Sequence, residues 1–207
     1  EEGFVTKQQT GQLQTAFGPI RSPGLAEAVR ILQAQGLAST PGYQSEINLR
    51  MGPWMHALAE SLTTGMALLI DYGYPRAEYY LPERNQGTLM CHFRHQAHAD
   101  PLAHLGLQDI TAHVDFTTLA QAGLDAGLQL AGYSTQANFL LGCGLDQRLA
   151  EASQNPDELL ALAAGAKQLV LPSAMGERFQ VMAFTRSLTP PGSGWCGFSS
   201  RDLSARL

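Results

Sequence analysis

The chain has 207 residues, a mass of 22.3 kDa and a formal net charge of -5 at pH 7. Apolar residues make up 44% of it, a share typical of globular proteins and too high for an intrinsically disordered chain. The basic surplus that marks nucleic-acid-binding proteins is absent, so we expect no nucleic-acid partner. The longest strictly apolar run, Leu159–Ala164, is much shorter than the roughly 18 residues of a membrane span, and the first residues do not resemble a signal peptide. We therefore expect no membrane association.

The cysteines are few and scattered along the chain. They are Cys91, Cys143 and Cys196, and no two of them form a CxxC pair. An odd, scattered set argues against a disulfide scaffold and favours a reducing compartment. We therefore expect a cytoplasmic, bacterial protein.

The N-terminal part predicts a small hairpin followed by a helix. Two short strands, Phe4–Lys7 and Leu13–Phe17, flank a turn at Thr10-Gly11. Ser22 is a candidate N-cap for the helix, and Gly36 is a candidate for its end.

The next segment predicts two helices and a buried strand. Ser45 is a candidate cap for a helix over Glu46–Met51, which Gly52-Pro53 should break or kink, and a second helix is expected from Pro53 to Gly65. Met66–Ile70 is apolar without alternation, a pattern typical of a strand buried on both faces in a parallel sheet. We expect this strand to end at Asp71.

The remainder alternates between strand and helix patterns, which indicates an α/β protein. We expect an irregular stretch over 72–110 with one strand at Thr88–Phe93, and then a weak strand at Asp109–Val114. A helix should follow from the cap Asp115 through Ala126, and then a strand at Leu128–Ser134. The last expected elements are a helix from Asn155 towards Leu169, a strand at Phe179–Thr185 and a loosely packed tail. Only about three long strands are visible, whereas a complete doubly wound sheet usually has five or six. The sequence therefore predicts part of a sheet.

Two clusters suggest ligand chemistry but have simpler explanations. The stretch Asn138–Gly144 could be a strand that runs into a nucleotide-binding glycine turn, although a helix end capped by glycines explains it better. The 92–98 segment, rich in histidine, could bind a metal, but it lacks an HExxH pattern and contains the cation Arg94. A polar loop is the simpler interpretation, and we assign no metal site.

Asp71 and the tyrosines beside it are more informative. In open parallel sheets, ligands bind beyond the carboxyl ends of the strands, where Asp71, Tyr72 and Tyr74 are expected. The alternative is a turn at the end of the strand in which Asp71 accepts backbone hydrogen bonds.

From Gly42 onward, short motifs follow one another in a distinctive order. They are Gly42–Leu49, Trp54, Leu69–Pro75, Gly87–Leu89, His95, Asp100-Pro101, Asp109–Phe116, Gly176–Phe179 and Gly197–Leu203. In order and spacing they resemble the MidA family of S-adenosylmethionine-dependent methyltransferases, which includes a mitochondrial complex I assembly factor that methylates arginine.

The resemblance implies part of a class I, Rossmann-like methyltransferase sheet, with its later strands and helical insertions. Residues 1–207 would form the C-terminal part of one methyltransferase-like domain: a hairpin and helix insertion at 1–42, helices and later strands at 43–186, and a tail at 187–207. The implied cofactor is S-adenosyl-L-methionine. In this family the glycine-rich cofactor loop lies in an N-terminal half that has no counterpart here, so we assign no cofactor-binding residue.

The implied activity is methyl transfer to a protein side chain, most simply arginine. A carboxylate matches the planar fork of donors on a guanidinium. The candidate substrate-binding residues are therefore three acids and the polar residues expected near them: Glu46, Asp71, Tyr72, Tyr74, His95, His113 and Asp115. Asp115 is also explained as a helix N-cap, and Glu46 as an acid at a helix start. No catalytic residue is assigned.

Two other functions stay open at this point. The chain could be a binding or assembly module without catalysis, or a metalloenzyme that uses the 92–98 histidine loop. An isolated half sheet would leave an unpaired strand edge, so we also expect self-association, as a homodimer or an aggregate.

Overall fold

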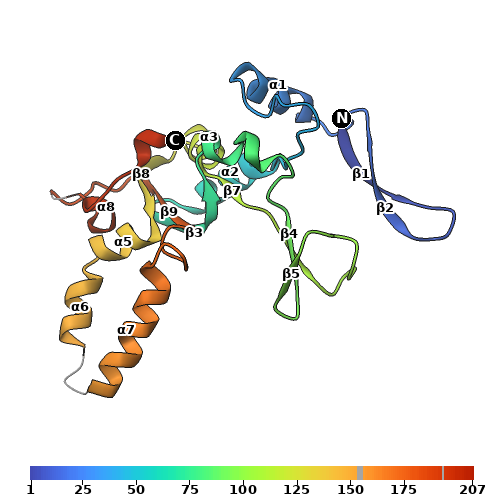
Figure 1. The fold of residues 1–207 in the computed structure, drawn as a ribbon. Helices are drawn as coiled ribbons and strands as arrows, with labels where there is room; N and C mark the ends of the chain where they lie inside the picture. Colours follow the sequence, from blue (N-terminus) through green and yellow to red (C-terminus); the bar gives the residue numbers. More distant parts are fainter. Residues whose placement is uncertain (153–155, 193) are drawn as a thin grey trace. The chain divides into compact units, whose positions relative to one another are not determined.

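The computed structural model describes residues 1–152, 156–192 and 194–207 (Figure 1). The chain forms two compact units. The first contains Glu1–Leu49 and Tyr80–His113, and the second contains Arg50–Tyr79 and Val114–Leu207. These divisions do not follow the expected boundaries at residues 42 and 186, and the assignment of the whole chain to one domain stays a prediction.

The first unit begins with the expected hairpin. Strands β1 (Glu2–Lys7) and β2 (Leu13–Gly18) pair antiparallel, and helix α1 (Leu25–Ala34) follows them. Gly36, with φ +73°, lies just beyond the end of α1, in the left-handed conformation that glycine tolerates best. Ser22 does not cap α1 as predicted, because its hydroxyl donates to the carboxylate of Glu2; the N-cap is Gly24.

A second, three-stranded sheet completes this unit. Its strands β4 (Met90–Phe93), β5 (Gln96–His98) and β6 (Asp109–Thr111) are antiparallel in the order β5-β4-β6, and a short 3-10 helix, η1 (Pro82–Arg84), precedes them. The strand expected within 88–93 is confirmed, whereas β5 was missed because three residues carry too little periodicity. The weak strand expected over 109–114 divides into β6 and β7 (Val114–Asp115).

The helix predicted for Glu46–Met51 is wrong. Residues 45–48 have no helical structure, and Gln44 forms a bridge with Gln86. Tertiary hydrogen bonds to this segment replace those of a helix. Helix α2 (Met51–Ser61) begins later and contains Pro53 in its first turn, where a missing N–H costs little. Gly52-Pro53 therefore lies inside α2 and does not interrupt it.

The second unit is built on a four-stranded sheet of order β7-β3-β9-β8. Strand β3 (Gly65–Tyr74) pairs antiparallel with β9 (Phe179–Arg186), which pairs antiparallel with β8 (Gln129–Thr135), whereas β7 pairs parallel with the end of β3. The strands expected at 128–134 and 179–185 are confirmed. Helices α3 (Arg76–Tyr79), α4 (Phe116–Asp125), α5 (Gln136–Gly142), α6 (Leu145–Glu151) and α7 (Pro156–Val170) complete it (Figure 1). The predicted cap of α7, Asn155, lies outside the described residues.

Apolar side chains cover β9 on both faces. Met182 and Phe184 belong to a core with α2 and α4 residues such as Met55 and Phe116. Val181, on the opposite face, belongs to a smaller cluster with the C-terminal segment. The mixed α/β layering agrees with the expected Rossmann-like methyltransferase sheet.

Strand β3 differs from its prediction. Instead of being buried on both faces, it leaves Leu68 42% and Ile70 48% exposed on one face, and over most of its length it pairs only with β9. The strand also continues beyond Asp71 to Tyr74. Its apolar composition therefore exceeds what the described residues cover.

The C-terminal tail is packed more tightly than predicted. Leu203 belongs to the main core, and its N–H donates to the carbonyl of Tyr133 at 2.7 Å. The hydroxyl of Ser134 donates to the carbonyl of Arg201. Short helices α8 (Cys196–Ser199) and η2 (Ser204–Arg206) lie in this segment. Turn-rich composition did not reveal these contacts because they depend on residues far away in the chain. None of the helices described is both long and apolar enough to cross a membrane.

The uncovered edge of β3 generates a first prediction. Unpaired backbone groups beside Leu68 and Ile70 form a template for another strand, so we expect this chain to self-associate. Ile70→Lys should shift it towards monomer, because a charge on the edge opposes pairing. The matched control is Leu160→Lys on α7, where the side chain is 72% exposed. Sedimentation velocity tests this, and a monodisperse wild-type monomer contradicts it.

Candidate functional site

The carboxylate of Glu46 is held by a turn of the first unit. It accepts the N–H of Thr88 at 2.9 Å, the hydroxyl of Thr88 at 3.1 Å and the N–H of Leu89 at 3.3 Å. Gly87 makes this approach possible, since a Cβ there would lie 2.2 Å from a Glu46 oxygen and φ is +76°. Glu46 is therefore an anchored carboxylate and does not open a helix.

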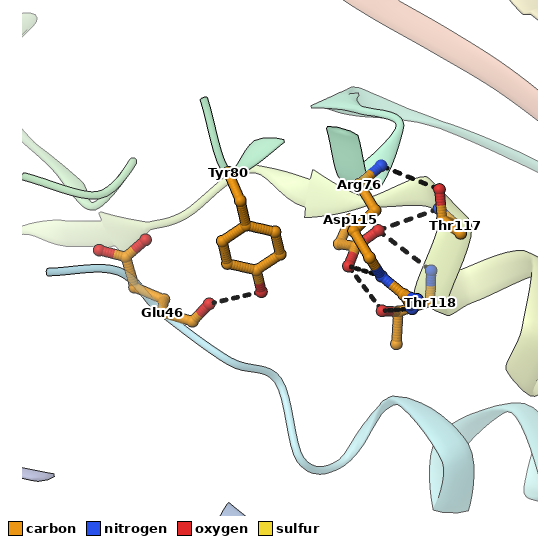
Figure 2. A network of polar contacts seen from close by, with 6 residues as sticks. All are labelled: Glu46, Arg76, Tyr80, Asp115, Thr117 and Thr118. Carbon is orange, nitrogen blue, oxygen red and sulfur yellow. Dashed lines mark hydrogen bonds and ion pairs between the residues drawn. The ribbon is translucent and has the colours of Figure 1, made fainter. Parts of the chain in front are cut away.

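Two further bonds tie this carboxylate turn to its surroundings. The Thr88 hydroxyl accepts the N–H of His113 at 3.0 Å. The Tyr80 hydroxyl donates to the carbonyl of Glu46 at 3.4 Å (Figure 2). The structure thus brings Glu46 and His113, two of the predicted residues, to the same buried threonine.

Asp115, in the second unit, is the centre of another polar network. As predicted, it caps α4: one carboxylate oxygen accepts the N–H groups of Thr117 and Thr118 at 3.0 and 3.1 Å. The other oxygen accepts the Thr118 hydroxyl at 2.6 Å and forms an ion pair with Arg76 at 3.4 Å (Figure 2). Arg76 also donates to both threonine hydroxyls. This largely buried carboxylate already binds a guanidinium, that of the chain itself.

Sequence reasoning missed Arg76 because its partner lies far along the chain. Its position directly after Pro75, at the end of a strand, was the available signal. Gly73 lets β7 approach β3 here, since a Cβ at Gly73 would lie 2.2 Å from the carbonyl oxygen of Val114. The close approach places Asp115 beside the end of β3.

Asp71 lies within β3 and not at its end, which corrects the prediction. It pairs with Gln180, is exposed, and accepts the N–H of Tyr72 at 2.8 Å. Because side chains alternate along a strand, Tyr72 and Tyr74 lie on the face opposite to Asp71. The structure therefore does not gather these three side chains on one face, although all are near the carboxyl end of β3.

His95 lies at the tip of the β4–β5 hairpin. It and Arg94 have positive φ values, 64° and 49°, in a two-residue turn where glycine or asparagine is usual. His95 is exposed, and the Arg94 guanidinium lies 5.2 Å from the centre of the Phe93 ring. The tip is thus a strained, basic element of the first unit. Along the chain it is separate from the Glu46 carboxylate turn.

The histidine loop does not form a metal centre. In the part of the chain that the structure describes, no three His, Cys, Asp or Glu side chains gather as ligands. His104 instead stacks on Phe93 at 4.1 Å and meets His98 edge-to-face. The metalloenzyme alternative finds no support in this arrangement.

The glycines at 142–144 form no cofactor loop. Helix α5 ends at Gly142, Cys143 caps it, and Gly144, with φ +78°, starts α6. The interpretation as a helix end with glycine caps is confirmed, and the alternative of a strand running into a nucleotide-binding turn is wrong.

Comparison with known proteins gives the family. Residues 1–134 match the model of a family described as "Putative S-adenosyl-L-methionine-dependent methyltransferase". The chain belongs to this family. Among curated relatives, the zebrafish "Protein arginine methyltransferase NDUFAF7, mitochondrial" is 37% identical over 122 residues, and the human protein of that name 35% over 130. These matches cover 56% and 59% of this chain and 26% of each relative.

Two crystal structures from Burkholderia thailandensis, members of one superfamily, show the same fold. Both have a TM-score of 0.89 over 99% of this chain, with 37% and 38% sequence identity. The second contains S-adenosyl-homocysteine. This chain spans 53% and 51% of their lengths, and about a quarter of the curated relatives.

The Glu46 carboxylate turn generates a second prediction. We expect Gly87→Ala to destabilise the first unit more than Gly106→Ala. Both glycines have a positive φ, which costs alanine about 1–2 kcal/mol, but only a Cβ at 87 collides with a carboxylate. Chemical denaturation of both variants measures the difference, and equal losses would show that the Glu46 contact contributes nothing.

Proposed function

We propose that the complete protein is an S-adenosyl-L-methionine-dependent methyltransferase that methylates a protein side chain, arginine being the preferred candidate. The observation that carries the proposal is the likeness, at 38% identity over 99% of this chain, to a protein crystallised with S-adenosyl-homocysteine. S-adenosyl-homocysteine is what remains of the cofactor after its methyl group is transferred. The arginine assignment rests on the relatives named as protein arginine methyltransferases.

The residues described here fit the substrate side of such an enzyme better than the cofactor side. None of the described glycine turns follows a parallel strand and opens a helix, which is the arrangement that holds the cofactor in this class of fold. When bound to the complete protein, the cofactor supplies the methyl group.

Asp71 is the proposed substrate carboxylate. Glu46 and Asp115 already bind partners within the chain, whereas Asp71 is exposed and accepts one backbone N–H through one oxygen. A carboxylate that retains an available oxygen can accept the N–H groups of an incoming guanidinium and fix the orientation of its nitrogen.

The other predicted residues take supporting roles in this proposal. Asp115 and Arg76 fix the end of β3, where Tyr74 lies, and Tyr72 is oriented by an edge-to-face contact with Phe179 at 5.7 Å. In the first unit, the Glu46 carboxylate turn holds the segment that ends at His113, and His95 is offered at a hairpin tip for contact with the protein substrate. We propose a cytoplasmic enzyme without nucleic-acid or membrane partners.

A binding or assembly role without catalysis remains the second candidate. The observation that favours it is that two of the three predicted carboxylates, Glu46 and Asp115, are fully engaged in holding the fold. Binding of a protein partner by the complete protein, without any methyl transfer to it, would support this role.

The third prediction concerns the cofactor. Residues 1–207 alone should bind S-adenosyl-L-methionine weakly or not at all, because Gly142–Gly144 lie at helix ends and do not form a glycine-rich cofactor loop. Isothermal titration calorimetry on this chain and on the complete protein makes the comparison. Micromolar binding by residues 1–207 would contradict it.

The fourth prediction concerns Asp71. In the complete protein, Asp71→Asn should lower methyl transfer roughly tenfold to a thousandfold, because it removes the charge that a guanidinium pairs with. Stability should change by less than about 1 kcal/mol, since the side chain is exposed. Rate, cofactor affinity and thermal midpoint are measured together.

The matched control is Asp125→Asn, an exposed carboxylate at the end of α4 that accepts a bond from Gln121. It should leave turnover unchanged. If Asp71→Asn keeps full turnover but melts earlier, Asp71 is structural and the proposed contact with the substrate is wrong.

A further inference from the structure

The end of α5 and the start of α8 are in unusually close contact. A Cβ at Gly142 would lie 2.5 Å from the carbonyl oxygen of Cys196, and a Cβ at Gly197 would lie 2.1 Å from the Phe139 ring. Only glycines allow the two backbones to approach this closely. Figure 1 shows α8 beside α5, although the two helices are separated in the chain by α6, α7 and β9.

Further contacts fix this approach. The rings of Phe139 and Phe198 meet edge-to-face with centres 5.3 Å apart. The hydroxyl of Ser200 donates to the carbonyl of Asn138 at 2.8 Å. Contacts on both sides of the glycines therefore hold the two helices in one arrangement.

Two free cysteines meet at this contact. Cys143 caps the end of α5 and is partly buried, and Cys196 is the first residue of α8 and is exposed. Burial and hydrogen bonding with the Cys196 thiol raise the pKa of the Cys143 thiol. The two sulfur atoms are thus neighbours, while one of them is open to solvent.

We propose that Cys143 and Cys196 are a modification site: on exposure to a peroxide they form an intramolecular disulfide. The requirement for such a bond is that the two backbones lie close together. The carbonyl oxygen of Cys196 lies 2.5 Å from where a Cβ at Gly142, the neighbour of Cys143, would stand. This oxidised pair is compatible with a reducing compartment, where such bonds are transient and sense oxidants.

The chemistry balances with a peroxide as the oxidant. The exposed Cys196 sulfur attacks the peroxide, an S–O bond forms as the O–O bond breaks, Cys196 becomes a sulfenic acid, and one molecule of water or alcohol leaves. The Cys143 thiol then attacks the sulfenic sulfur, the S–O bond breaks and a second molecule of water leaves with the proton of Cys143. The two sulfurs lose two electrons, which the peroxide gains, and a small thiol reverses the reaction.

Cys91 provides the internal control. It lies on β4 in the other unit and is fully buried, so a peroxide has little access to it. Trypsin also separates the three cysteines, because Cys91, Cys143 and Cys196 fall on the peptides Asn85–Arg94, His95–Arg148 and Ser187–Arg201. A peptide map therefore distinguishes every possible pairing.

The experiment treats the reduced protein with hydrogen peroxide, blocks free thiols by alkylation and maps tryptic peptides by mass spectrometry. We expect the peptide that contains Cys143 to be linked to the one that contains Cys196, lighter by two hydrogen atoms than the two free peptides, with Cys91 alkylated. The thermal midpoint should rise by roughly 5–10 °C, because the bond closes a long loop of the chain. A reducing thiol should abolish both changes.

Cys196→Ser should remove the linked peptide and the thermal shift, and Cys91→Ser should keep both. The proposal is overturned if wild-type protein gives a stable sulfenic acid at Cys196, a link to Cys91, or only links between molecules. The wild-type map decides the question even if a cysteine variant fails to fold.

Discussion

The antiparallel pairing of β3 with β9 is the interaction on which the second unit depends. It runs from Gly65 opposite Arg186 to Tyr72 opposite Phe179, and it brings together segments from early and late in the chain. Four consecutive β9 residues, Val181–Phe184, are fully buried, and their side chains supply cores on both faces of the sheet. Because β9 also pairs with β8, this one strand positions the carboxyl end of β3 on one side and the start of α5 on the other.

The chain uses its acidic side chains in two distinct ways. Glu46 and Asp115 each accept several backbone and hydroxyl hydrogens, and Asp115 also neutralises Arg76. Such bonds hold two distant segments at a fixed separation. Asp71 lacks this internal role. Glu46 and Asp115 thus organise the fold, whereas Asp71 is available to a ligand. The sequence alone predicts substrate binding for all three acids.

Much of the second unit could be predicted because its signals are local. Asp115 is followed by residues with helical periodicity, and Phe179–Thr185 is a compact apolar run, so the α4 cap and β9 are readable from a few neighbouring residues. The errors concern residues whose environment is set from afar. Glu46 stands before an apparent helix pattern, but bonds to Thr88 and Leu89 hold its segment in a different conformation.

The same distinction explains the candidate site. Which residue types cluster near the end of β3 was predictable, since Asp71, Tyr72 and Tyr74 are consecutive or nearly so. The sequence did not predict which of these side chains share a face, because the strand was expected to end at Asp71. Instead β3 continues for three more residues, and along an extended strand successive side chains point to opposite faces. Arg76 was missed for a related reason: the partner in its ion pair, Asp115, lies far along the chain.

Strand β3 has more apolar side chains than the described residues cover. Leu68 and Ile70 share a face with Met66, which packs in the smaller core cluster, yet they are about half exposed. Covering a leucine or isoleucine side chain is worth about 1.5–3 kcal/mol, so an edge strand that normally faced water would favour polar residues at these positions. An apolar run without alternation instead suits a strand that is covered on both faces. The sequence expectation of double burial was wrong for the residues described, but its physical basis still identifies this face of β3 as the place where further apolar cover would be most stabilising.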